Sequence, residues 1–187
     1  MSEIIIVKPN LGHFDNWYSY TIALPTVDFW WRLGCTPNML TFLGFYFSVL
    51  FAIHFYLGQR LAFLFLVLRM YFDYADGLMA RKYHQSSDFG DIFDHLSDWF
   101  FMVAALVVTL LNRTMTEFYL LCAAGILLSM QLETVEQACQ GRVKHSKMLQ
   151  TLRIFDPFVS SHTISELLKF TDTSFFYFIL SVIVLLF

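Results

Sequence analysis

Residues 73–98 read DYADGLMARKYHQSSDFGDIFDHLSD and carry closely spaced aspartates between strongly apolar flanks. A charged side chain at the centre of a membrane-spanning helix costs about 2.5–3.5 kcal/mol on insertion scales, so these aspartates need a physical reason. At 100° per residue, one stripe of the first helix carries two aspartates and two small residues: Asp73, Asp76, Gly77 and Ala80. One stripe of the second helix carries Gly90, Asp94 and Asp98. The pattern therefore predicts two helices that each present one acidic face.

The two acidic faces are expected to meet at the same depth. The polar loop 82–89 is short, so the helices that it joins are antiparallel neighbours. Asp73 lies 13 residues after Arg60, and Asp98 lies 13 residues before Leu111. At 1.5 Å per residue, both aspartates are about 20 Å from the far surface of a membrane, so the four carboxylates gather at one level.

Four carboxylates gathered in this way need counter-charge. Oxygen ligands favour hard cations such as Mg²⁺ or Mn²⁺, and two such ions would balance four negative charges. Paired metal ions suit phosphoryl transfer, because they clamp the attacking and the leaving oxygen. The small residues Gly77, Ala80 and Gly90 let helices approach closely and leave space for a nucleotide. The alternative, that the aspartates form only salt bridges or helix caps, explains neither the shared depth nor the small residues.

The composition around this stretch indicates a membrane protein. Of 187 residues, 57% are hydrophobic and 14% are charged, whereas soluble domains carry about 45–50% apolar and about 25% charged residues. A formal net charge of −3 gives no reason to expect nucleic acid as a partner. The three cysteines have no spacing typical of a disulfide framework or a metal site, and the N-terminus has no pattern of a cleaved signal peptide.

Five apolar stretches are read as membrane spans, the last of them short: Leu40–Leu57, Leu61–Met79, Ile92–Leu111, Phe118–Leu132 and Phe175–Phe187. The sequence thus predicts an all-α, polytopic transmembrane helical bundle at 38–187, within a single domain over 1–187. The stretch Gln140–Asp172 is expected to form one or two interfacial helices, or to contain a sixth, degenerate span.

The segment 1–36 is expected to lie on the membrane surface. Its stretch Asn16–Leu33 mixes aromatic residues with charges, which is typical of an interfacial amphipathic helix. Thr36-Pro37-Asn38 then ends this helix and starts the first span. Placing the N-terminus in the cytosol puts nine loop Lys and Arg residues on the cytosolic side and only Arg60 and Arg113 on the other. We therefore expect an integral membrane protein whose active site lies at the cytosolic side.

The pattern DxxDGxxAR, then eight residues, then GxxxDxxxD resembles the signature of the CDP-alcohol phosphatidyltransferases, and every defined position is filled. The resemblance covers 33–101, since LGCTPNMLT at 33–41 looks like the start of that family's first span. It implies an enzyme in which an alcohol attacks a CDP-linked donor, a phosphodiester lipid forms and CMP leaves. Phe93-Asp94-His95 resembles the choline and ethanolamine phosphotransferase branch, whereas 85–90 looks like the phosphatidylinositol synthase branch. His95 itself is interpreted as a hydrogen-bonded helix residue.

The resemblance also implies roles for individual residues. The four aspartates would bind two ions, Mg²⁺ or Mn²⁺, with Asp73 and Asp94 shared between both. Asp98 would touch the second ion and take the proton from the acceptor hydroxyl as the catalytic base. Independently of the resemblance, Arg69 lies inside the second span, four residues before Asp73, where an arginine is a candidate functional residue. It either binds an anionic group of donor or acceptor, or pairs with Asp73 before metal binds. Positions that match donor contacts in the family are Asn38, Thr41, Gly77, Arg81 and Ser87.

Two substrate pairings stay open. The donor is CDP-diacylglycerol with a small polar alcohol such as inositol or glycerol phosphate, or it is CDP-choline or CDP-ethanolamine with diacylglycerol as acceptor. A homodimer is expected by family analogy alone. Two other classes of protein compete: a divalent-cation carrier that uses the same aspartates, and a catalytically inactive membrane scaffold. The carrier hypothesis does not explain Gly77 and Arg81, and the scaffold hypothesis does not explain why all four aspartates are present.

Overall fold

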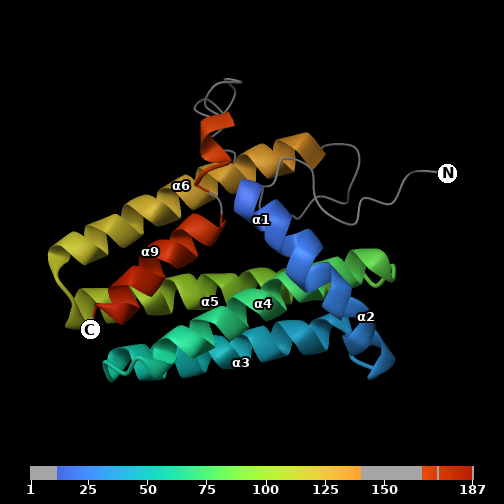
Figure 1. Cartoon of the computed structure of the whole chain (residues 1–187), viewed down its shortest axis with the longest axis horizontal. Helices are drawn as coiled ribbons and strands as arrows, with labels where there is room; N and C mark the ends of the chain where they lie inside the picture. Colours follow the sequence, from blue (N-terminus) through green and yellow to red (C-terminus); the bar gives the residue numbers. More distant parts are fainter. Residues whose placement is uncertain (1–11, 140–165, 172, 187) are drawn as a thin grey trace.

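The computed structural model describes residues 12–139, 166–171 and 173–186, and no strand occurs among them. An N-terminal arm consists of α1 (His13–Tyr18), the π-helical turn η1 (Ser19–Ala23) and α2 (Leu24–Arg32). The bundle that follows consists of α3 (Pro37–Tyr56), α4 (Leu61–Lys82), α5 (Asp88–Asn112), α6 (Met115–Cys139) and α9 (Thr173–Leu185) (Figure 1). The prediction of an all-α fold is confirmed for this part of the chain.

Three of the described helices are long and apolar enough to cross a membrane: α3, α5 and the part of α6 over 115–135. Helix α9 is apolar but shorter. Helix α4 carries Arg69, Asp73 and Asp76 in its interior, and Arg69 and Asp76 are only 3% and 4% exposed. Its charges therefore point into the bundle, as expected for ionisable residues at membrane depth. A described helix lies at each of the five predicted spans, but only three of these helices meet the length and composition of a span, so the number of spans stays a prediction.

Helix ends follow local capping rules. Thr36 caps α3 by accepting a hydrogen bond from the Met39 N–H (3.4 Å), and Pro37 occupies the first turn, so the predicted boundary at 36–38 is confirmed. Ser87 caps α5 in the same way through the Gly90 N–H (3.0 Å). The helix consequently starts at Asp88, one turn before the apolar stretch. Helix α4 runs on to Lys82, since basic residues in a last turn suit the helix dipole.

The N-terminal arm packs across α4 (Figure 1). Ala23 and Val27 are fully buried against it, and the Trp30 indole N–H donates to the Tyr71 hydroxyl (2.7 Å). Aromatic side chains on the other side of the arm are exposed, among them Trp17, Tyr20 and Phe29. The arm is continuously helical from His13 to Arg32, so the helix expected at 16–33 is confirmed, with the π-helical turn η1 as its one irregularity. Its exposed aromatic face agrees with the predicted position at a membrane surface.

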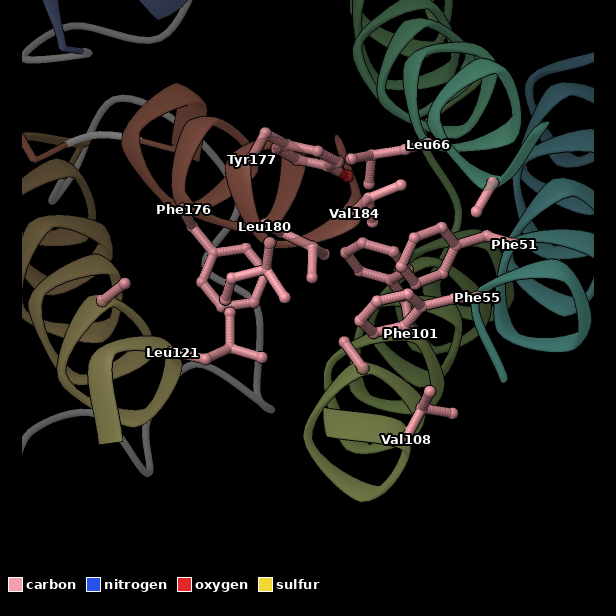
Figure 2. Packing of buried hydrophobic residues seen from close by; sticks show 14 of the residues in the cluster. Phe51, Phe55, Leu66, Phe101, Val108, Leu121, Phe176, Tyr177, Leu180 and Val184 are labelled. Atoms are coloured by element: carbon pink, nitrogen blue, oxygen red, sulfur yellow. The ribbon is translucent and has the colours of Figure 1, made fainter. Parts of the chain in front are cut away.

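Helix α9 fills the space between α6 and the group formed by α3, α4 and α5 (Figure 2). Phe176 and Leu180 are buried there, and the Tyr177 ring stacks on Phe101 of α5 with centroids 5.5 Å apart. This packing brings the C-terminal helix beside the two helices that carry the aspartates. The interfacial helices or sixth span predicted for Gln140–Asp172 lie almost wholly outside the described residues.

Two neighbouring leucines of α6 provide a test of this packing. Leu121 is fully buried in the cluster of Figure 2, whereas Leu120 is 51% exposed. Leu121→Ala leaves a cavity and is expected to lower the free energy of unfolding by about 2–5 kcal/mol. Leu120→Ala should change it by less than about 0.5 kcal/mol. Unfolding of the purified protein in detergent measures both, and equal losses would contradict the packing of α6 against α9.

Candidate active site

The four aspartates of α4 and α5 line one cavity of about 260 Å³. Helices α4 and α5 both pack against α3, and their acidic faces turn to the cavity. Residues of α1, η1, α6 and α9 complete its wall. Other residues singled out by the sequence that also line it are Arg69, Gly77 and Arg81. Those that do not are Asn38, Thr41, Ala80, Ser87 and Gly90.

The aspartates differ in their access to the cavity. Asp76 is buried, with 4% exposure. The side chains of Asp73, Asp94 and Asp98 are 22%, 34% and 39% exposed. Asp98 is thus the most accessible of the four and Asp76 the most enclosed.

The residues present fit a divalent cation. Asp94, His95 and Asp98 can each offer one ligand atom, and these atoms lie within 4.8 Å of one another. Carboxylate oxygens with one imidazole nitrogen form a donor set that divalent metals accept. Asp73 and Asp76 line the same cavity. The sequence interpretation left His95 out of the metal set, whereas the structure places its ring within this group.

Thr41 of α3 supports the most enclosed aspartate. Its hydroxyl donates to Asp76 Oδ2 (2.6 Å), inside the bundle. Thr41 is 5% exposed, so the bond is shielded from solvent. The resemblance implies a donor contact for Thr41. The structure gives its hydroxyl a different partner, the carboxylate of a predicted metal ligand.

Arg69 binds two of the aspartates. Its Nη1 lies 3.2 Å from Asp73 Oδ1, and its Nη2 donates to Asp98. Nη1 also donates to the Tyr177 hydroxyl of α9. Of the two sequence-based alternatives for Arg69, the structure contains the pairing with Asp73, and binding of an anionic group stays a prediction.

The residues predicted to contact the donor fall into two groups. Gly77 and Arg81 lie on the cavity, and a Cβ at Gly77 would come within 3.1 Å of Arg81 Nη1. The missing side chain therefore lets the guanidinium lie against α4. Asn38 and Ser87 lie together at the start of α5, where a Cβ at Gly90 would meet Asn38 Oδ1 at 2.8 Å and Ser87 Oγ at 3.0 Å. Gly90 thus allows α3 to approach this end of α5.

An ion pair fixes the end of α4 next to Arg81. Lys82 pairs with Asp28 of α2, and the Tyr83 hydroxyl donates to the same carboxylate (2.7 Å). The hydrogen bonds from Lys82 and Tyr83 hold the pKa of Asp28 below its usual value. The Trp31 and Tyr83 rings stack with centroids 4.1 Å apart. The arm thereby holds the last turn of α4 in place.

The sequence interpretation did not place Asp15 and Tyr177 in the site. Asp15 of α1 is 2% exposed and lines the cavity. It accepts from the Tyr74 hydroxyl and from the Thr173 N–H at the start of α9 (3.2 Å). Tyr177 likewise reaches the site from α9. Only an acidic residue in an aromatic arm pointed to Asp15, and nothing pointed to Tyr177.

The fold and the site together define a helical membrane protein with a carboxylate-lined cavity suited to a divalent cation. A family model described as CDP-alcohol phosphatidyltransferase matches residues 35–186, and the chain belongs to this family. The resemblance inferred from 73–98 is therefore confirmed.

A relative gives a more specific comparison. An archaetidylinositol phosphate synthase of Pyrococcus horikoshii is 40% identical to this chain over 67 residues. The match covers 35% of this chain and 36% of the relative, so it spans about a third of each protein. It is consistent with the phosphatidylinositol synthase-like branch.

The bond between Thr41 and Asp76 can be tested with a pair of variants. Thr41→Val keeps the shape of the side chain but removes the hydroxyl that orients Asp76. Because groups that orient a metal ligand contribute to binding, Mn²⁺ affinity is expected to fall about 10–100-fold. Thr41→Ser keeps the hydroxyl and should retain most of the affinity. Mn²⁺ titration of the purified variants measures this, and unchanged affinity in Thr41→Val would exclude a supporting role.

Proposed function

We propose that the protein is a membrane-embedded enzyme of phospholipid synthesis. It transfers a substituted phosphate group from a CDP-linked donor to an alcohol and releases CMP. One observation carries the proposal: four aspartates, Gly77 and Arg81 line a single cavity in a chain of the CDP-alcohol phosphatidyltransferase family.

The proposed reaction is a substitution at phosphorus. The acceptor hydroxyl oxygen bonds to the donor phosphorus that is distal to the cytidine, and the pyrophosphate P–O bond breaks. CMP leaves with the electrons of that bond. Asp98, which has the most exposed side chain of the four, takes the proton of the hydroxyl. The guanidinium of Arg81 binds a phosphate of the donor, since its planar fork suits phosphate oxygens.

Two divalent cations, Mg²⁺ or Mn²⁺, are proposed for the cavity. Asp73, Asp76, Asp94 and Asp98 would hold them, with His95 close enough to take part. When bound, such ions neutralise the charge on the phosphates and on the leaving oxygen. The chain itself positions the carboxylates through Thr41 and Arg69.

The relative favours one of the two substrate pairings. Its name describes a product with an inositol phosphate headgroup, which supports a CDP-linked lipid as donor and a polar alcohol such as inositol phosphate as acceptor. The run Phe93-Asp94-His95 favours the other pairing, a CDP-amino-alcohol with diacylglycerol. We propose the first pairing, at the cytosolic face of the membrane, where the basic residues 81 and 82 end α4.

The experiment offers each CDP-linked donor with each acceptor, plus Mg²⁺ or Mn²⁺, to membranes that contain the protein. CMP release is measured and the lipid product is identified. CMP formed only with a CDP-linked lipid and a polar alcohol supports the first pairing. Absence of CMP with every pairing contradicts the proposal and favours the scaffold, or the carrier if the same membranes pass Mn²⁺ without nucleotide.

Two aspartates of α5 provide a matched comparison. Asp94→Asn removes one negative charge at the cavity and is expected to reduce CMP release by about 100-fold or more. Asp88 lies in the first turn of the same helix, exposed and away from the cavity, so Asp88→Asn should keep nearly full activity. Both variants are first checked for insertion into the membrane. Retained turnover in an inserted Asp94→Asn variant contradicts a metal-binding role for Asp94.

A further inference from the structure

Arg69 joins three helices from within the wall of the cavity. It lies on α4, is 3% exposed, and its guanidinium reaches Asp73 one turn further along the same helix. It also donates to Asp98 of α5 and to the Tyr177 hydroxyl of α9. The Phe101 ring supports the guanidinium, with Cζ 4.7 Å from the ring centroid.

We propose that Arg69 is a tethered counter-ion that competes with a divalent cation for Asp73 and Asp98. In the metal-free protein the guanidinium holds these two carboxylates together. A cation that binds them displaces it or shares their oxygens with it. The inference rests on the proposed function only in requiring that the site takes a divalent cation.

The contacts divide the acidic cluster into two sides. Arg69 binds Asp73 and Asp98, whereas Asp76 accepts its bond from Thr41. Asp98 is also one of the three residues whose ligand atoms lie within 4.8 Å of one another. A cation at that group therefore meets a ligand that already accepts a hydrogen bond from a positive charge.

The guanidinium of Arg69 cannot make room for a cation by losing its proton and its charge. Arginine stays protonated in proteins, and like charges repel strongly where water is scarce. Arg69 must therefore move, or the second cation binds weakly. We infer that without a donor phosphate the site binds one cation tightly and a second one less tightly.

The Arg69 side chain does not use all of its hydrogen-bond donors in this position. Its Nε–H is buried and has no hydrogen-bond partner among the described residues. A buried donor without an acceptor is destabilising, and moving the guanidinium breaks no hydrogen bond at Nε.

The experiment measures Mn²⁺ binding and thermal stability on purified protein without nucleotide. Wild type is expected to bind one Mn²⁺ tightly and a second about tenfold more weakly. Arg69→Gln removes the competing charge, so the second Mn²⁺ should bind about tenfold more tightly than in wild type. The same variant should have a lower Tm than wild type without metal, and Mn²⁺ should raise its Tm by more.

Arg113→Gln is the matched control. The Arg113 guanidinium also lies over a phenylalanine ring, with Cζ 5.1 Å from the Phe55 centroid, but it is not part of the cavity wall. Its substitution should leave Mn²⁺ affinity and stoichiometry at wild-type values. Arg69→Lys keeps the positive charge but lacks the planar guanidinium that reaches Asp73, Asp98 and Tyr177 at once. This variant should bind the second Mn²⁺ with an affinity between those of wild type and Arg69→Gln.

Two tight Mn²⁺ sites in wild type, or wild-type Mn²⁺ binding in Arg69→Gln, would overturn the inference. If Arg69→Gln folds only with Mn²⁺, the counter-ion role is supported. If Arg69→Gln folds neither with nor without Mn²⁺, the test uses Arg69→Lys instead. Wild-type affinity of Arg69→Lys for the second Mn²⁺ then overturns the inference. None of these measurements uses a CDP-linked donor. Absence of CMP release therefore bears on the proposed function alone, and unchanged Mn²⁺ binding bears on Arg69 alone.

Discussion

Four carboxylates inside a membrane bundle have to be neutralised or hydrogen-bonded, and this requirement governs the packing of α3, α4 and α5. Arg69 neutralises part of the charge on Asp73 and Asp98, and Thr41 bonds to Asp76 from the neighbouring helix. These partners exist only if α3 lies against α4 while α5 faces the same cavity. The site and the helix arrangement therefore depend on one another, and α4 can be rich in charge because its charges find partners inside the bundle.

The acidic part of the site could be predicted because it follows helical spacing. Asp73 and Asp76 are three residues apart and Asp94 and Asp98 four, each close to one helical turn, so helix geometry alone gives each pair a common face. The short loop 83–87 then returns the chain, and both helices pack on α3 with these faces turned to one cavity. The start of α3 could be predicted for a similar reason, since the Thr36-Pro37 cap is a local signal.

The remaining parts of the site depend on packing between distant segments. Tyr177 is 108 residues from Arg69, and Thr173 is 158 residues from Asp15. No periodicity links such pairs, because their contact depends on where α9 and α1 dock against the bundle. Thr41 could be singled out only by resemblance, and its bond to Asp76 depends on the rotation of α3 against α4. The π-helical turn η1 within the arm had no signal either, since its residues also suit a regular helix.

The wall of the cavity joins two kinds of surface. Its polar side comes from α4 and α5 and carries the aspartates and Arg81, while Met102, Leu128, Leu132 and Phe176 form an apolar side from α5, α6 and α9. A phosphate group needs the polar side, since metal ions and guanidinium groups bind it there. A hydrocarbon chain needs the apolar side. The proposed donor, a CDP-linked lipid, carries both groups in one molecule and would contact both sides of the wall, whereas a free nucleotide would contact only the polar side.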